Sequence, residues 1–132
     1  MDPSFTQHGA FSWSELMTDD VEAAKTYYQT VIGWEIEEKD MGGMTYNVVK
    51  ADGQPVGGIM GKPPGAEQIP NHWGTYITVD DVDKTLAKAE AAGGKALYPP
   101  MDVPTVGRMC AILDPTGAVV SVITYVPCDE QS

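Results

Sequence analysis

The chain has 132 residues and a formal net charge of −11, from 19 acidic and 8 basic residues. This length suits a single domain with a hydrophobic core. The acidic charge argues against nucleic acid and against an anionic membrane surface as partners. Residues 1–8 show no signal-peptide pattern, and no apolar run reaches the roughly 20 residues of a membrane span. Two cysteines, Cys110 and Cys128, do not make a disulfide framework. We therefore expect a cytoplasmic protein.

The first half of the chain predicts a strand, a helix and three more strands. After a flexible lead-in at 1–8, alternation over 10–17 indicates a half-buried strand with Trp13, Glu15 and Met17 on one face. Asp19 is the expected N-cap of the following helix, which Gly33 ends. Further strands are predicted at 34–38, 44–51 and 54–60, with turns at Met41-Gly42-Gly43 and Ala51-Asp52-Gly53.

The second half restarts the same order after a proline-containing linker at 61–71. A strand is predicted at 73–79, and Asp80 is the expected N-cap of a helix that Gly93-Gly94 ends. The remaining predicted elements are strands at 95–98, 108–113 and 118–125, a proline-rich loop at 99–107, and a turn at 114–117.

The two halves read as copies of one β-α-β-β-β unit, at 9–60 and 72–127, within one domain at 9–127 followed by a tail at 128–132. Asp20 and Asp81 are 61 positions apart (81 − 20), and the same offset relates Gly33 to Gly94. The later turns are 64 positions apart (117 − 53), so the second copy carries three extra residues. We place the insertion in the proline-rich loop, where binding specificity is expected. The predicted fold class is α+β.

Several segments carry a family resemblance in the same order along the chain. They are the two strand–Asp-Asp-Val–helix segments, Tyr27-Tyr28 with Ile32-Gly33-Trp34, Ala92-Gly93-Gly94, and Gly107-Arg108 through Asp114-Pro115-Thr116-Gly117. Together they resemble the vicinal oxygen chelate superfamily, which includes glyoxalase I, bleomycin- and fosfomycin-resistance proteins and extradiol dioxygenases. Segments 71–76 and 99–104 are similar to a glyoxalase-like or hydroxylase-like branch. The resemblance implies a cupped mixed sheet, helices outside, a small-molecule pocket inside, and commonly a divalent metal.

The resemblance also implies metal ligands on the first and last strand of each unit, typically His or Gln on the first and Glu on the last. Those places hold Trp13, Gly57, Gly74 and Ser121, and none is a good ligand for a first-row divalent ion. A slip of one or two positions offers only Glu15, because His72 precedes the second strand. We therefore expect no family-type metal and no other cofactor.

Glu15 and His72 are the candidate catalytic residues. A carboxylate that faces an apolar cavity has a raised pKa suited to proton transfer. The alternative is that Glu15 pairs at the rim with Arg108 or water. His72 could lie over the pocket mouth, or serve as a structural hydrogen bonder. A thiol deep in a strand, such as Cys110, is expected to be inert.

The candidate ligand-binding residues are mostly aromatic. Aromatic rings could stack on a flat ligand or belong to the core. Arg108 could bind a carboxylate or phosphate, or form an ion pair at the rim. The full set is Trp13, Tyr46, Trp73, Tyr76, Arg108 and Ser121.

Three functions stay open at this point. The leading hypothesis is that the chain binds a small apolar or aromatic molecule without metal, as resistance-type members do by sequestration. The second is an enzyme of the glyoxalase or dioxygenase type, using either a metal on unconventional ligands or metal-free proton transfer by Glu15. The third is a protein-interaction module with a vestigial pocket. A homodimer is a further expectation.

Overall fold

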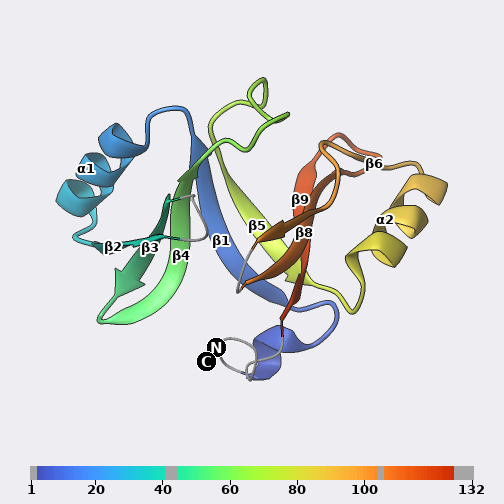
Figure 1. The fold of residues 1–132 in the computed structure, drawn as a ribbon, viewed down its shortest axis with the longest axis horizontal. Coiled ribbons are helices and arrows are strands. Elements are labelled where there is room, and N and C mark those ends of the chain that lie inside the picture. The colour runs from blue at the N-terminus through green and yellow to red at the C-terminus, as the bar shows by residue number, and fades with distance from the viewer. Residues whose placement is uncertain (1–2, 41–44, 104–105, 127–132) are drawn as a thin grey trace. The chain divides into compact units, whose positions relative to one another are not determined.

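The computed structural model describes residues 3–40, 45–103 and 106–126, which form two compact units (Figure 1). We call residues 13–74 the first-repeat unit, and residues 1–12 with 75–132 the second-repeat unit. The division falls inside strands β1 (Phe11–Thr18) and β5 (His72–Thr78). Each unit has its own hydrophobic core, so each is described by itself.

The first-repeat unit is a mixed sheet in the order β2-β3-β4-β1, with helix α1 (Val21–Val31) against one face. Strand β1 pairs in parallel with β4, and the other neighbours are antiparallel. The remaining strands are β2 (Glu35–Asp40), β3 (Thr45–Ala51) and β4 (Gln54–Gly61). The core on the helix side is built from Leu16, Val49 and Ile59, covered by Val21, Ala24, Tyr28, Trp34 and Ile36.

The second-repeat unit has the corresponding order β5-β9-β8-β6, and β7 also pairs with β8. Strand β5 pairs in parallel with β9. The other elements are α2 (Val82–Ala91), β6 (Lys95–Ala96), β7 (Met101–Val103), β8 (Gly107–Leu113) and β9 (Val119–Tyr125). The core under α2 contains Val79, Val82, Cys110, Ile112 and Val122.

The predicted lead-in contains a short 3-10 helix, η1 (Pro3–Thr6). The hydroxyl of Thr78 donates to the carbonyl of Phe5, and the backbone N–H of Asp80 donates to His8 Nδ1 at 3.0 Å. These bonds join residues before β1 to the end of β5 within the second-repeat unit.

Both predicted helix caps are wrong by one residue. Asp20, not Asp19, accepts from the backbone N–H of Ala23, and Asp81, not Asp80, accepts from that of Lys84, each at 3.0 Å. The reason is geometric, because a capping oxygen must reach the third helical N–H, counted from where the helix begins. The proline-rich segment predicted as a loop contains strand β7. The turn at 41–43, Pro104, Cys128 and the tail at 128–132 lie outside the described residues.

A β-bulge corrects the alignment of the two repeats. Val49 pairs with Gly57 and Lys50 with Pro55, so Val56 is an extra residue in β4. The β8–β9 ladder has no such shift from Gly107 to Leu113. The parallel strand pairs therefore identify which positions of the two repeats correspond. Glu15 lies beside Gly58, and Tyr76 lies beside Ser121. Gly58, rather than the predicted Gly57, is the counterpart of Ser121.

Among the described residues, no helix has the length and apolar character that crossing a membrane would need.

Candidate functional site

Alternation along β1 sends its side chains to opposite faces of the first-repeat sheet. Leu16 belongs to the core under α1, so Glu15 and Met17 face away from that helix. Strand β4 alternates in the same way, and Gly58 and Met60 share the face of Glu15 through their pairing with β1. We call this surface the Glu15 face.

Three predicted residues meet on the Glu15 face in one hydrogen-bonded chain. The phenol of Tyr46 donates to Glu15 Oε2 at 2.7 Å, and the indole N–H of Trp13 donates to Tyr46 Oη at 2.8 Å. An indole N–H can only donate, so the oxygen of Tyr46 accepts from it and directs its own proton to the carboxylate. Glu15 is only 4% exposed. The pKa shift predicted for Glu15 stays a prediction.

Gly58 makes room for this chain. A Cβ added at Gly58 would collide with the phenol of Tyr46. The resemblance implies a glutamate ligand on the last strand of each unit, and in this unit Tyr46 fills the space that such a side chain would need. The residue before Glu15 on the same face, Trp13, offers only an N–H donor there.

The residues present do not fit a divalent metal of the family type. The corresponding positions of the second repeat hold Gly74, in β5, and Ser121, in β9, which provide neither imidazole nor carboxylate. Within the described ranges, no three His, Cys, Asp or Glu side chains gather into a possible metal site.

His72 is the first residue of β5, not a residue before it as the sequence suggested. Its Nδ1 lies 2.8 Å from the carbonyl oxygen of Pro70, which can only accept, so Nδ1 carries the proton. His72 and Gly74 are neighbours on one face, with 3.7 Å between the ring and the position of a Cβ at Gly74.

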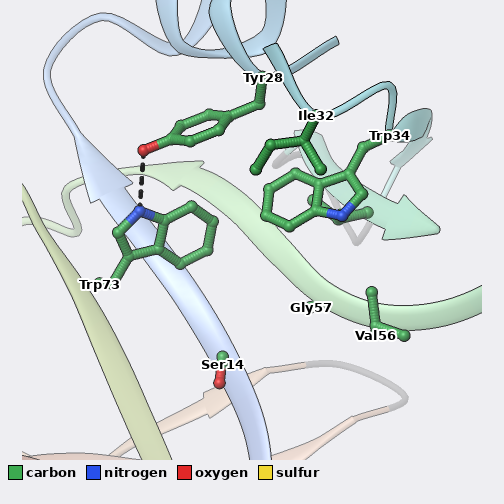
Figure 2. Close-up of a pocket in the computed structure, with 8 residues that line it drawn as sticks. Ser14, Tyr28, Ile32, Trp34, Val56, Gly57 and Trp73 are labelled. Carbon is green, nitrogen blue, oxygen red and sulfur yellow. Dashed lines mark hydrogen bonds between the residues drawn. The ribbon is translucent and has the colours of Figure 1, made fainter. Parts of the chain in front are cut away.

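Trp73 belongs to a different surface, on the helix side of the first-repeat sheet. It lines a pocket of about 310 Å³ with Tyr28 and Trp34, as Figure 2 shows. Its indole N–H donates to the hydroxyl of Tyr28 at 3.0 Å. The other lining residues are Ser14, Ile32, Val49, Val56 and Gly57. The sequence did not indicate this pocket, because its pattern places Tyr28 on the packed stripe of a helix and Trp34 at the start of a strand.

Tyr76 and Ser121 lie side by side in the second-repeat unit and are both buried. The hydroxyl of Tyr76 donates to the sulfur of Met109 at 3.9 Å. Cys110, on the helix side of β8, is fully buried and unbridged, and its thiol donates to the carbonyl of Tyr98 at 3.4 Å. Burial raises the pKa of the Cys110 thiol, which disfavours the reactive thiolate.

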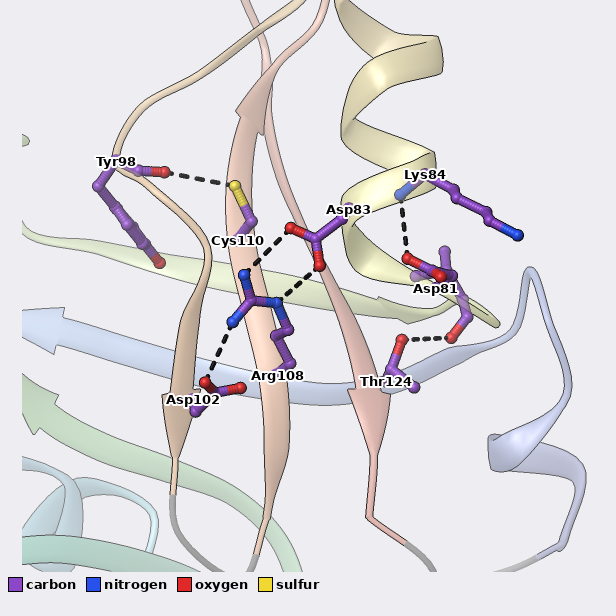
Figure 3. A network of polar contacts seen from close by, with 9 residues as sticks. Asp81, Asp83, Lys84, Tyr98, Asp102, Arg108, Cys110 and Thr124 are labelled. Carbon is purple, nitrogen blue, oxygen red and sulfur yellow. Dashed lines mark hydrogen bonds and ion pairs between the residues drawn. The ribbon is translucent and has the colours of Figure 1, made fainter.

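Arg108 joins two elements of the second-repeat unit (Figure 3). Its guanidinium forms a two-pronged pair with Asp83 of α2, at 2.8 and 3.1 Å, and a third bond with Asp102 of β7, at 3.1 Å. Hydrogen bonding to Arg108 lowers the pKa of Asp83, and the two carboxylates raise the pKa of Arg108. The ligand-binding role of Arg108 stays a prediction.

We expect Arg108→Gln to lower the melting temperature at pH 7. The pKa of Asp83 is lowered in the folded state. Its ion pair with Arg108 therefore stabilises the fold above the ordinary Asp pKa of about 4, and this stabilisation is lost as pH falls through the lowered pKa. The difference between the variant and the unmodified chain should therefore shrink between pH 5 and pH 2 in thermal unfolding. A difference that stays constant to pH 2 would contradict this assignment.

Proteins of related sequence connect this architecture to a known family. A 121-residue stretch is 43% identical to "Putative glyoxylase CFP32" of Mycobacterium tuberculosis, covering 90% of this chain and 45% of the relative. The anthracycline biosynthesis protein DnrV of Streptomyces peucetius is 33% identical over 127 residues, covering 86% of this chain and 46% of the relative. The chain therefore spans about half the length of these curated relatives.

The solved structure of methylmalonyl-CoA epimerase from Mycobacterium tuberculosis matches with a TM-score of 0.62 at 14% identity, covering 100% of this chain and 97% of that one. The Streptomyces coelicolor enzyme matches with a TM-score of 0.60 at 13% identity, covering 92% and 100%. At such identities the likeness shows the fold, and it confirms the predicted α+β class. A sequence model of the Glyoxalase/Bleomycin resistance protein/Dioxygenase superfamily also matches residues 10–122. The chain belongs to the Glyoxalase/Bleomycin resistance protein/Dioxygenase superfamily.

Proposed function

We propose that this chain binds a small, largely apolar or aromatic molecule on its Glu15 face, without a divalent metal. The observation that carries the proposal is the chain of hydrogen bonds from Trp13 through Tyr46 to the buried carboxylate of Glu15. Buried carboxylates are costly unless they are hydrogen-bonded, and this one is held in a fixed position by Tyr46.

The surroundings of Glu15 suit a mostly apolar ligand with a hydrogen-bond donor. Met17 and Met60 lie directly opposite each other on the Glu15 face, and both are buried. Thioethers adapt to irregular apolar shapes and make favourable contacts with aromatic rings. A carboxylate accepts hydrogen bonds, so it would orient the donor of a ligand whose apolar body contacts the methionines.

The comparisons support a small-molecule ligand. Members of this superfamily bind small molecules. One relative is named for anthracycline biosynthesis, and anthracyclines are flat, fused-ring compounds. Because that relative is about twice as long as this chain, the transfer to this chain is a proposal.

Daunorubicin, an anthracycline with a cationic amine, should bind the chain, and Trp13→Ala should weaken binding about tenfold through loss of an aromatic contact. Fluorescence titration measures the affinity. Val119→Ala, which shortens a side chain that is 39% exposed at the start of β9 in the second-repeat unit, is the control and should have no effect. Equal affinities for both variants and the unmodified chain would contradict ligand binding at Trp13.

After treatment with a chelator, the protein should show no change in melting temperature on addition of Ni²⁺, Zn²⁺, Mn²⁺, Fe²⁺ or Co²⁺. A specific site filled at 100 times its dissociation constant would add about 2.7 kcal/mol, a rise on the order of 10 °C. A rise of that size, together with one equivalent of metal in the purified protein, would refute the metal-free proposal.

Metal-free proton transfer by Glu15 is the second candidate function. The buried carboxylate favours it, and the fold neighbours include enzymes named as epimerases. Epimerisation at carbon requires removal of a proton from one face and delivery of a proton to the opposite face, and a positioned carboxylate can perform the removal.

Glu15→Gln separates this second candidate from binding alone. If Glu15 acts as a base, incorporation of solvent deuterium into methylmalonyl-CoA, followed by mass spectrometry, should fall at least 100-fold in the variant. Affinity for daunorubicin should stay within a few-fold. Tyr46→Phe keeps the ring and removes only the donor to Glu15, so a smaller loss of exchange is expected. No exchange by the unmodified chain, or parallel losses of exchange and binding, would count against catalysis on this compound.

A further inference from the structure

We infer that the helix-side pocket of the first-repeat unit is a second binding site, which takes a flat, uncharged aromatic molecule. The pocket lies on the opposite face of the sheet from Glu15, because Ser14 lines it and neighbours Glu15 on β1. It is therefore independent of the function proposed above.

The aromatic walls of the pocket are held in place (Figure 2). The ring of Tyr28 lies 5.3 Å from that of Trp34 and 5.4 Å from that of Trp73, and the two indoles are 5.8 Å apart. Trp73 meets both neighbours edge to face, and its N–H is bonded to the Tyr28 hydroxyl. Rings fixed by packing and by a hydrogen bond lose little entropy when a ligand binds.

The second repeat shows that the fold itself does not require these aromatic residues. At the offset of 61 positions, Tyr28 corresponds to Ala89 and Trp34 to Lys95. Ala89 and its neighbours pack α2 against its sheet, and Val82 of that helix is 1% exposed. In contrast, α1 has no buried residue. The first repeat therefore has large rings where the second repeat has a small or a charged residue, and its helix is more exposed to solvent.

The backbone also opens the pocket. The extra residue of the β4 bulge, Val56, lies on its wall and is 45% exposed. Gly57 follows it, and a Cβ there would lie 2.7 Å from the carbonyl oxygen of Ser14. The corresponding β8–β9 ladder has neither bulge nor shift. Bulges are common next to binding sites, where they change the direction of side chains.

The size and chemistry of the pocket define its occupant. A volume of about 310 Å³ is at the lower end for small-molecule sites, which suits two or three fused or linked rings. No lining side chain is charged, and the chain as a whole is strongly acidic, so an anion is disfavoured. A second copy of the chain fits less well, because stable interfaces use about 20 to 30 residues a side. Eight residues line this pocket.

The test uses N-phenyl-1-naphthylamine, an uncharged fluorescent compound with linked aromatic rings. Two variants, Tyr28→Ala and Trp34→Lys, introduce the residues found at the corresponding positions of the second repeat and so remove one aromatic wall each. We call them the emptied variants. A third, Ser14→Leu, fills the pocket instead of emptying it, and keeps the test decisive if an emptied variant does not fold. The controls are Phe11→Ala, outside the pocket, and Glu15→Gln, on the opposite face.

We expect one equivalent of the compound to bind, at least tenfold more weakly to Ser14→Leu and to each folded emptied variant. Both controls should bind within twofold of the unmodified chain. Unchanged binding to Ser14→Leu, or loss of binding in Glu15→Gln, would overturn the inference. Sedimentation provides a further check. If the chain self-associates, and if Ser14→Leu abolishes this association but leaves binding of the compound unchanged, the pocket is a contact between copies of the chain and the inference is overturned. Failure of daunorubicin to respond to Trp13→Ala would affect only the proposed function.

Discussion

Each unit depends on a parallel pair between its first and last strand. The pairs β1–β4 and β5–β9 fix which side chains share a face, and a shift of one residue would reverse every assignment. In the first-repeat unit this pairing places Gly58 beside Glu15, which leaves room for the phenol of Tyr46. A hydrogen bond from this phenol then stabilises the buried carboxylate.

The two repeats pack the same order of elements in different ways. Helix α2 packs closely on its sheet through small and aliphatic residues, and Arg108 joins it to β7, within the proline-rich segment. Helix α1 packs through Val21, Ala24 and the ring of Tyr28, and the bulge at Val56 leaves space beside that ring. Duplication therefore provides an internal comparison, in which a difference at matched positions indicates a role beyond stability. The rings of Tyr28 and Trp34 are such a difference.

The two surfaces of the first-repeat sheet also differ chemically. One carries a carboxylate, a phenol and buried methionines, and the other carries uncharged aromatic rings. Because alternate residues of a strand face opposite sides, Ser14 and Glu15 contribute to different surfaces although they are adjacent in the chain. The predicted set of aromatic ligand-binding residues is divided accordingly, with Trp13 and Tyr46 on one side and Trp73 on the other.

The sequence by itself determined the order of the elements, the duplicated unit and the family, because periodicity, turn residues and repeat spacing are local patterns. It also identified Trp13, Glu15 and Tyr46 as candidates, although not as one hydrogen-bonded chain. Tertiary structure decided the rest. The Val56 bulge moved the alignment from Gly57 to Gly58. Packing of α1 brought together Tyr28 of that helix, Trp34 of the loop that follows it, and Trp73 of β5. Strand register and helix packing bring together residues far apart in the chain, so local patterns do not determine them.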